Sequence, residues 1–386
     1  MRSWTIALAS LMLMVAPAWT QRRSPVESFD QLAGAAEAAR RAGRFEQALA
    51  LYRRALIARP DWAEGWWHVG TLLYERDLFA EAAAAFERTT TLDPKVGTAW
   101  VMLGLCEFKL SRHKDALAHI QRGRRLGTSS DPQFRRVMLY HEGLLLIGEG
   151  AFEQARRTLG LLSRDGVENE ELVTALGLAA LNRRFADLLA GDQRIKRLVQ
   201  RVGWAENLAA QKRVDEALRE YESLLADFPE ERNVNYAFGR FLLDVRDNDR
   251  AALAFAREIE LHPDNVAARL NFAALKARSD PQLALRHAEE AVKLNARLPL
   301  GHYLLGSLLL QTGQIARAIA ELEIAQRALP DEPQIYFALA RAYARANRLR
   351  DAERARAIFR RLTEERRSPE SDGAEVPHTI NQKDPR

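Results

Sequence analysis

A pattern of small and apolar residues returns along this sequence at a step of about 34 residues. Gly70 and Ala82 come back as Gly104 and Ala116, in the same order and spacing. Periods between 20 and 50 residues are typical of stacked repeat arrays, in which each unit packs only against its neighbours. The pattern therefore predicts an elongated array, although a length of 386 residues would by itself suggest two or three compact domains.

Each repeat contains two segments with helical periodicity. Apolar residues from Ala63 to Tyr74 recur at steps of three and four, which predicts one face of a helix. The same periodicity runs from Ala80 to Thr90, and Pro94 follows, where the chain disfavours the helical conformation. Gly70 and Ala82 are small, so they are expected where the two helices cross closely. Each unit is thus predicted to be a helical hairpin.

This spacing resembles the tetratricopeptide repeat, a family of paired helices with large, small and proline positions in fixed order. The residues of one unit that match the family pattern are Trp66, Val69, Gly70, Ala82, Phe86 and Pro94. The resemblance extends over about residues 29–366. It implies an all-α fold, a right-handed superhelical solenoid of about ten stacked helix-turn-helix units.

The array is predicted to have two regular stretches and an irregular middle. N-terminal units occupy 29–167 and C-terminal units 198–366, and the second helix of the last unit is rich in arginine and glutamate, as suits a terminal cap. Residues 168–197 are predicted to be a degenerate unit or a bend, because Phe185 to Gly191 is too short for a regular second helix. Asp192 is positioned to cap a new helix.

The two ends of the chain differ from the repeats. Residues 1–18 combine Arg2, an apolar run from Trp4 to Val15 and the small residues of Ala16-Pro17-Ala18, which predicts a signal peptide and a secreted or periplasmic protein. A retained membrane anchor and a cytoplasmic location are the alternatives; the apolar run is shorter than the ~20 residues that a bilayer requires. Residues 19–28 are predicted to be a disordered lead-in, and the proline- and charge-rich residues 367–386 a disordered tail.

The composition offers little catalytic chemistry. A net charge of +5 is small for this length and does not predict nucleic-acid binding. Cys106 is the only cysteine and is expected to be a buried packing residue. The eight histidines show no metal-binding motif, and no serine lies in a nucleophile-elbow setting. We expect neither an enzyme nor a metal or other cofactor.

The family resemblance implies a concave groove lined by the first helix of each unit. Carried over position by position, the residues expected to bind a partner are Trp67, Thr71, Tyr74, Val101, Leu105, Phe108, Tyr140, Leu144, Tyr236, Arg240, Tyr303, Phe337 and Arg341. Tyrosine, tryptophan and arginine often anchor partners at interfaces, although several of these side chains could instead pack against adjacent helices. The family's lysine and asparagine clamp for a C-terminal carboxylate is not present at the matching positions.

The favoured function is a non-catalytic scaffold that binds an extended peptide or a partner protein in this groove. The alternative is an accessory protein for envelope assembly or polysaccharide export, which would bind partners through its convex face and its termini, at residues such as Arg88 or Glu321. A hydrolase or transferase whose site forms only in the folded superhelix is a third possibility. The sequence does not identify the partner or the oligomeric state.

Overall fold

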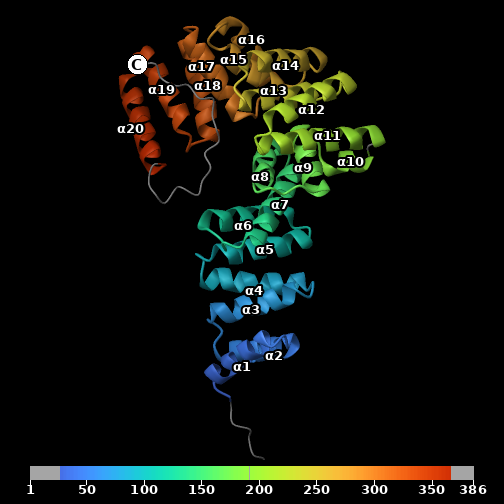
Figure 1. Cartoon of the computed structure of the whole chain (residues 1–386). Helices are drawn as coiled ribbons and strands as arrows, with labels where there is room; N and C mark the ends of the chain where they lie inside the picture. The colour runs from blue at the N-terminus through green and yellow to red at the C-terminus, as the bar shows by residue number, and fades with distance from the viewer. Residues whose placement is uncertain (1–26, 191, 367–386) are drawn as a thin grey trace, which may run out of the picture.

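The computed structural model describes residues 27–190 and 192–366. This part of the chain forms 20 helices and no strand, and most successive helices pack against each other along an elongated array (Figure 1). The predicted all-α solenoid of about ten helix pairs is confirmed. The predicted signal peptide, most of the lead-in and the predicted tail lie outside the described residues.

The first four helix pairs stack regularly, with the second helix of one pair contacting the first helix of the next. Figure 1 shows α1 to α6 as a straight column. Their bounds are α1 Phe29–Arg41, α2 Phe45–Ala58, α3 Ala63–Tyr74, α4 Phe79–Leu92, α5 Gly97–Lys109, α6 His113–Leu126, α7 Pro132–Glu149 and α8 Phe152–Arg164. Helix α3 has the predicted bounds, and α4 extends the predicted second helix at both ends.

Small residues allow the helices of a pair to approach closely. A Cβ atom on Gly70 would lie 2.7 Å from the ring of Phe86, far inside van der Waals contact. Ala82 is fully buried. The predicted role of these two positions is therefore confirmed, and the residue that fills the space above Gly70 is the aromatic ring of the second helix.

The middle of the array departs from the regular pairing. It comprises α9 Glu170–Ala180, α10 Phe185–Ala190, α11 Gln193–Ala210 and α12 Val214–Asp227. Helix α10 has only six residues. Helix α11 begins directly after Asp192, whose side chain accepts a hydrogen bond from the backbone N–H of Ile195 (3.0 Å).

Helix α11 belongs to two packing arrangements at once. It packs against α9 on one side and against α12 on the other. The contact with α9 is a backbone-to-backbone approach, because a Cβ on Gly177 would lie 1.9 Å from the carbonyl oxygen of Val199, and one on Gly203 would lie 1.8 Å from that of Val173. The 18-residue α11 thus joins the first stretch of units to the second.

The remaining helices resume the regular pairing. They are α13 Val234–Asp244, α14 Asn248–Leu261, α15 Val266–Lys276, α16 Pro281–Leu294, α17 Pro299–Gln311, α18 Ile315–Ala328, α19 Pro333–Arg345 and α20 Leu349–Glu365. In Figure 1 this stretch curves away from the column formed by α1 to α6, and α20 lies at its outer edge. Within residues 27–190 and 192–366, no helix has the length and apolarity that a bilayer crossing needs.

Candidate partner-binding surface

Two aromatic side chains of α3 from the predicted groove are only half-buried. The Trp67 ring packs against Phe86 with 5.4 Å between centroids, and Tyr74 meets the edge of Phe79 at the same centroid separation. Burial raises the pKa of the Tyr74 hydroxyl above its usual value. Each ring thus packs against a neighbouring ring on one side and keeps part of its surface accessible to solvent.

The aromatic surface continues over α5 and α7. Phe108 contacts the ring of His141 edge-on at 4.8 Å, and His141 in turn lies 5.9 Å from Tyr140. Burial lowers the pKa of His141, which favours the neutral imidazole, and burial raises the pKa of Tyr140. Three successive first helices therefore present half-buried, uncharged aromatic groups.

The other predicted lining residues differ in how far their side chains are exposed to a partner. The Thr71 hydroxyl donates to carbonyl oxygens of its own helix, at 3.0 Å from His68 and 3.2 Å from Trp67. Leu144 and Tyr303 are half-buried. Phe337 and Arg341 are exposed on α19.

Three predicted lining residues are buried in the core: Val101, Leu105 and Tyr236. Helices α5 and α6 cross at glycines, so a Cβ on Gly123 would lie 2.6 Å from Val101 Cγ2. This close crossing covers Val101, and Leu105 packs in the same core cluster. Tyr236 is covered from the side of α14, where its ring contacts Phe255 at 5.9 Å. These three side chains offer a partner no surface in this structure.

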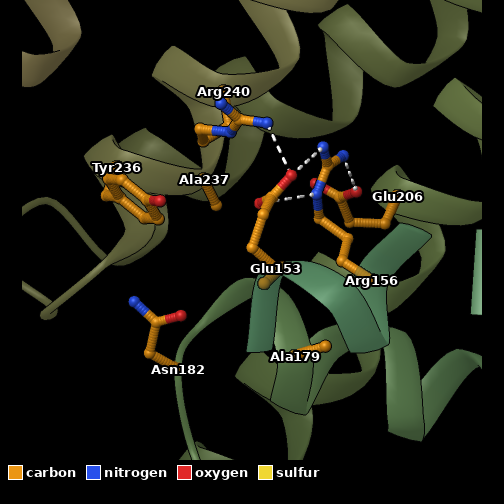
Figure 2. A pocket seen from close by; sticks show the side chains of 9 residues that line it. Glu153, Arg156, Ala179, Asn182, Glu206, Tyr236, Ala237 and Arg240 are labelled. Atoms are coloured by element: carbon orange, nitrogen blue, oxygen red, sulfur yellow. Dashed lines mark hydrogen bonds and ion pairs between the residues drawn. The ribbon is translucent and has the colours of Figure 1, made fainter. Parts of the chain in front are cut away.

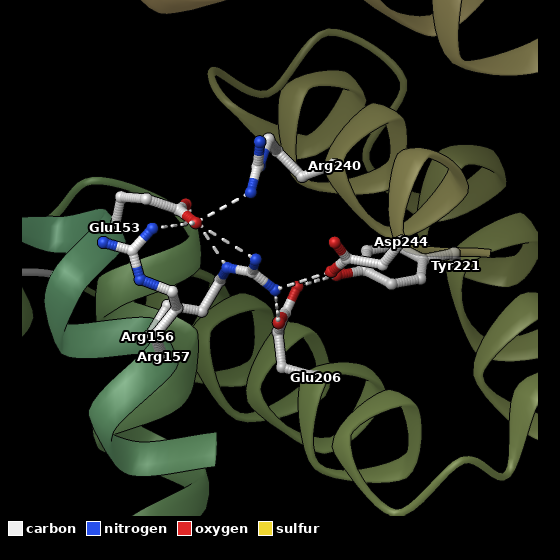
Figure 3. Close-up of polar contacts among 7 residues, drawn as sticks. All are labelled: Glu153, Arg156, Arg157, Glu206, Tyr221, Arg240 and Asp244. Carbon is white, nitrogen blue, oxygen red and sulfur yellow. Dashed lines mark hydrogen bonds and ion pairs between the residues drawn. The ribbon is translucent and has the colours of Figure 1, made fainter. Parts of the chain in front are cut away.

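A cluster of buried charges at the bend was not predicted from the sequence. Arg156 on α8 lies at its centre (Figure 3). Its Nη2 is 3.2 Å from Oε1 of Glu153 on the same helix, and its Nη1 is 3.1 Å from Oε2 of Glu206 on α11 and 3.2 Å from Oδ2 of Asp244 on α13. Arg240 on α13 pairs with Glu153 at 2.7 Å. The cluster therefore links α8, α11 and α13.

The charges in this cluster stabilise one another. Burial alone would lower the pKa of Arg156, but the carboxylates of Glu206, Glu153 and Asp244 outweigh it and raise the pKa well above its usual value. Burial would likewise raise the pKa of Glu153, and the guanidinium groups of Arg156 and Arg240 lower it. Tyr221 donates a 2.5 Å hydrogen bond to Glu206.

Four residues of the cluster, Glu153, Arg156, Glu206 and Arg240, also line a narrow hollow between α8, α9, α11 and α13 (Figure 2). Its empty volume is about 200 Å³ even when the open space at its mouth is counted, below the ~300–1,000 Å³ of typical ligand sites. Every carboxylate of the cluster has an arginine partner within 3.2 Å. With no free base and little space for a substrate, the arrangement acts as a structural tie between helices.

A sequence signal for this cluster existed. Glu206 and Asn207 interrupt the buried face of α11, between Ala205 and Leu208, and an acidic residue at such a place needs a cation nearby. The partner could not be identified, because Arg156 is 50 residues away.

Within residues 27–190 and 192–366, no group of three or more histidine, cysteine or acidic side chains is arranged so that it could hold a metal ion. Cys106 is fully buried, as predicted, and burial raises the pKa of its thiol to about 12.

The geometry defines a solenoid of helical hairpins with a tied bend. The family model for the tetratricopeptide repeat matches residues 34–95, 69–131, 202–266, 272–333 and 303–372. The chain belongs to the tetratricopeptide repeat family, and it is a protein-protein interaction scaffold of that class.

Solved structures that match part of the chain include those of MamA. A crystal structure of MamA is 18% identical, with 42% of this chain and 95% of that chain covered and a TM-score of 0.39. The 41-end fragment of MamA from Desulfovibrio magneticus RS-1 is 22% identical, with 44% and 97% covered and a TM-score of 0.38. No curated protein matches the chain in sequence.

Proposed function

We propose that this chain binds an extended peptide or a partner protein along the first helices of its N-terminal units, without catalysing a reaction. The observation that carries the proposal is the set of half-buried aromatic residues Trp67, Tyr74, Phe108 and Tyr140 on α3, α5 and α7. Aromatic side chains fixed by neighbouring rings lose little entropy on binding, which is why such residues anchor partners.

The character of this surface indicates the kind of partner. Its aromatic groups are neutral, so the expected contact is an apolar or aromatic segment of a protein rather than a nucleic acid. In the second stretch of units, Arg240 is already paired with Glu153, and Tyr236 is buried. We therefore place the main contact on α3, α5 and α7.

The test is a set of substitutions that remove the half-buried aromatic rings. A peptide selected from a random library displayed on phage is bound to the full chain, and its affinity is measured by fluorescence anisotropy. Replacing Trp67, Phe108 and Tyr140 by alanine should weaken binding at least ~100-fold if each acts as an anchor worth about 1 kcal/mol or more.

A matched control removes an exposed apolar side chain from a second helix. Ile57 on α2 is 82% exposed, and Ile57→Ala should leave the affinity unchanged. Peptides that bind the triple variant as tightly as the parent chain, with helix content preserved in both, would contradict the proposed surface.

We also propose that residues 1–18 direct export, so that the protein works outside the cytoplasm, secreted or in the periplasm. The support is the charged start, the apolar run and Ala16-Pro17-Ala18. N-terminal sequencing of the mature protein tests this: a chain that begins at Trp19 agrees with the proposal, and a chain that keeps Met1 contradicts it.

A further inference from the structure

The last helix pair leaves apolar surface uncovered at the end of the array. Among the residues equivalent to Phe337 inside the array, Val101 is 0% exposed and Tyr236 8%, and Trp67, Tyr140 and Tyr303 are half-buried, against 48% exposed for Phe337 itself. The Phe337 ring lies 5.5 Å from that of Phe359 on α20. Figure 1 shows α20 at the outer edge, where no further described helix follows to cover these rings.

Three exposed arginines lie on the same two helices as the rings, Arg341 on α19 and Arg356 and Arg360 on α20. The guanidinium of Arg341 lies over the ring of Phe337, 5.7 Å from its centroid, and Arg356 and Arg360 flank Phe359 one turn apart on α20. We call Phe337, Arg341, Arg356, Phe359 and Arg360 the end patch.

The arginines of the end patch have no acidic partner among the described residues. Within the described ranges, Arg341, Arg356 and Arg360 form no ion pair, whereas Arg354 on the same helix pairs with Asp351 at 2.8 Å. Like charges one turn apart repel each other. The end patch is therefore suited to a segment that combines several carboxylates with small apolar side chains.

The chain itself contains a segment of this composition. Residues 368–377 carry Glu370, Asp372 and Glu375, with no lysine or arginine, and end with Val376-Pro377. The three negative charges of this segment equal in number the three arginines of the end patch.

The described chain ends at Arg366, two residues before this segment, and Arg366 contacts the residues that precede α19. Arg366 donates a 2.8 Å hydrogen bond to the carbonyl oxygen of Asp331, just before α19. Phe337 is six residues further on, about 6 Å along the helix axis from Pro333, where α19 begins. The four residues from Arg366 to Glu370 can span up to about 13 Å, so Glu370 reaches the patch and the following acids can pass across it.

We propose that residues 368–377 of the same chain cover the end patch, with Glu370, Asp372 and Glu375 facing its arginines. The segment then takes the place of a further helix pair and occupies Phe337 and Arg341. This contact does not depend on partner binding at α3, α5 and α7, so either proposal can fail without the other.

Pulsed EPR on the full-length chain tests the contact. Spin labels are attached at Ser371→Cys and Glu353→Cys, and the buried Cys106, with its raised thiol pKa, stays unlabelled. A covered patch predicts one narrow distance distribution. High salt should broaden it, because the paired charges lie at the surface.

Charge reversal supplies the decisive comparison. Arg341→Glu, Arg356→Glu and Arg360→Glu together should broaden the distribution. Adding Glu370→Arg, Asp372→Arg and Glu375→Arg should make it narrow again. Reversal of three exposed arginines elsewhere, at Arg125, Arg136 and Arg278, should have no effect.

Two results would overturn the proposal. One is a broad distribution in the parent chain that charge reversal leaves unchanged. The other is a defined distance that appears only between singly labelled chains mixed together, which would mean that a second copy occupies the end patch.

Discussion

Arg156 on α8 and Asp244 on α13 are 88 residues apart in the sequence, and their Nη1 and Oδ2 atoms lie 3.2 Å apart in the structure. Between them the chain forms the short α10 and the shared α11. The contact therefore spans the bend and fixes how the second stretch of units leaves the first.

Removing the central cation should weaken the bend strongly. Arg156→Met leaves Glu206, which is 3% exposed, without its arginine, and losing one partner of a buried ion pair costs about 3–5 kcal/mol. We expect a lower urea midpoint in unfolding followed by far-UV circular dichroism. The matched control is Arg157→Met, because Arg157 lies at the edge of the cluster, 3.8 Å from Glu153, and should cost below about 1 kcal/mol. Equal midpoints for the two variants would contradict the assigned role.

A methyl group between α9 and α11 should be poorly tolerated. In Gly177→Ala the new Cβ would lie 1.9 Å from a backbone oxygen of Val199, so the two helices must separate. Overpacking of this kind costs about 1–3 kcal/mol or more, which the thermal midpoint will report.

The control for this substitution is Gly148→Ala on α7. No atom lies within 4 Å of the added methyl group there, and the change should stabilise the helix by about 0.5–1 kcal/mol. The packing argument fails if both glycine variants shift the midpoint in the same direction by the same amount.

Local periodicity explains why the fold could be predicted. The helix over Ala63–Tyr74 was predicted with its observed bounds, because the spacing of its apolar residues depends only on helical geometry. The residues of the binding surface could be predicted less well, because they were assigned from their position within each repeat unit. Val101 occupies the same position as Trp67, but the glycine crossing of α5 and α6 buries it.

Contacts between distant units are the part that could not be predicted. The sequence shows only that three charged residues lie on predicted helices, Arg156, Arg240 and Glu206. It does not indicate which residue each of them pairs with. Only the bend brings them together, and the bend arises from the close approach of α9 and α11 rather than from a repeated pattern.

The thiol of Cys106 should not react in the native protein. Burial raises its pKa to about 12, so the reactive thiolate is almost absent at neutral pH, and the side chain is fully buried. We expect no absorbance change with Ellman's reagent at neutral pH and one equivalent of reaction after denaturation. Rapid labelling of the folded chain would contradict this environment.

The first helix pair should lose stability at both ends of the pH scale. Hydrogen bonds from Arg40 and Arg41 hold the pKa of Glu37 well below its usual 4.5, so this stabilisation is present above that value and is lost as the pH falls. Burial and the hydrogen bond to Glu37 raise the pKa of Tyr52 from 10 to about 12, so its contribution is present below pH 10 and is lost by about pH 12.

Urea midpoints measured at a series of pH values check both limbs. Glu37→Gln removes the titrating carboxyl and should flatten the fall between about pH 5 and about pH 3 relative to the parent chain. An acid limb as steep in Glu37→Gln as in the parent would show that other carboxyls dominate it.

The double membership of α11 limits how a protein of this kind can grow. Duplicating a whole hairpin inside either regular stretch repeats an interface that already exists. An extra hairpin inserted before α11 would separate it from α9 and remove the glycine contact. One inserted after α11 would move α13 away from α8 and remove the ion pairs of Arg156 with Asp244 and of Arg240 with Glu153. Duplication of a hairpin can therefore lengthen either regular stretch of the array, but it would disrupt the packing around α11.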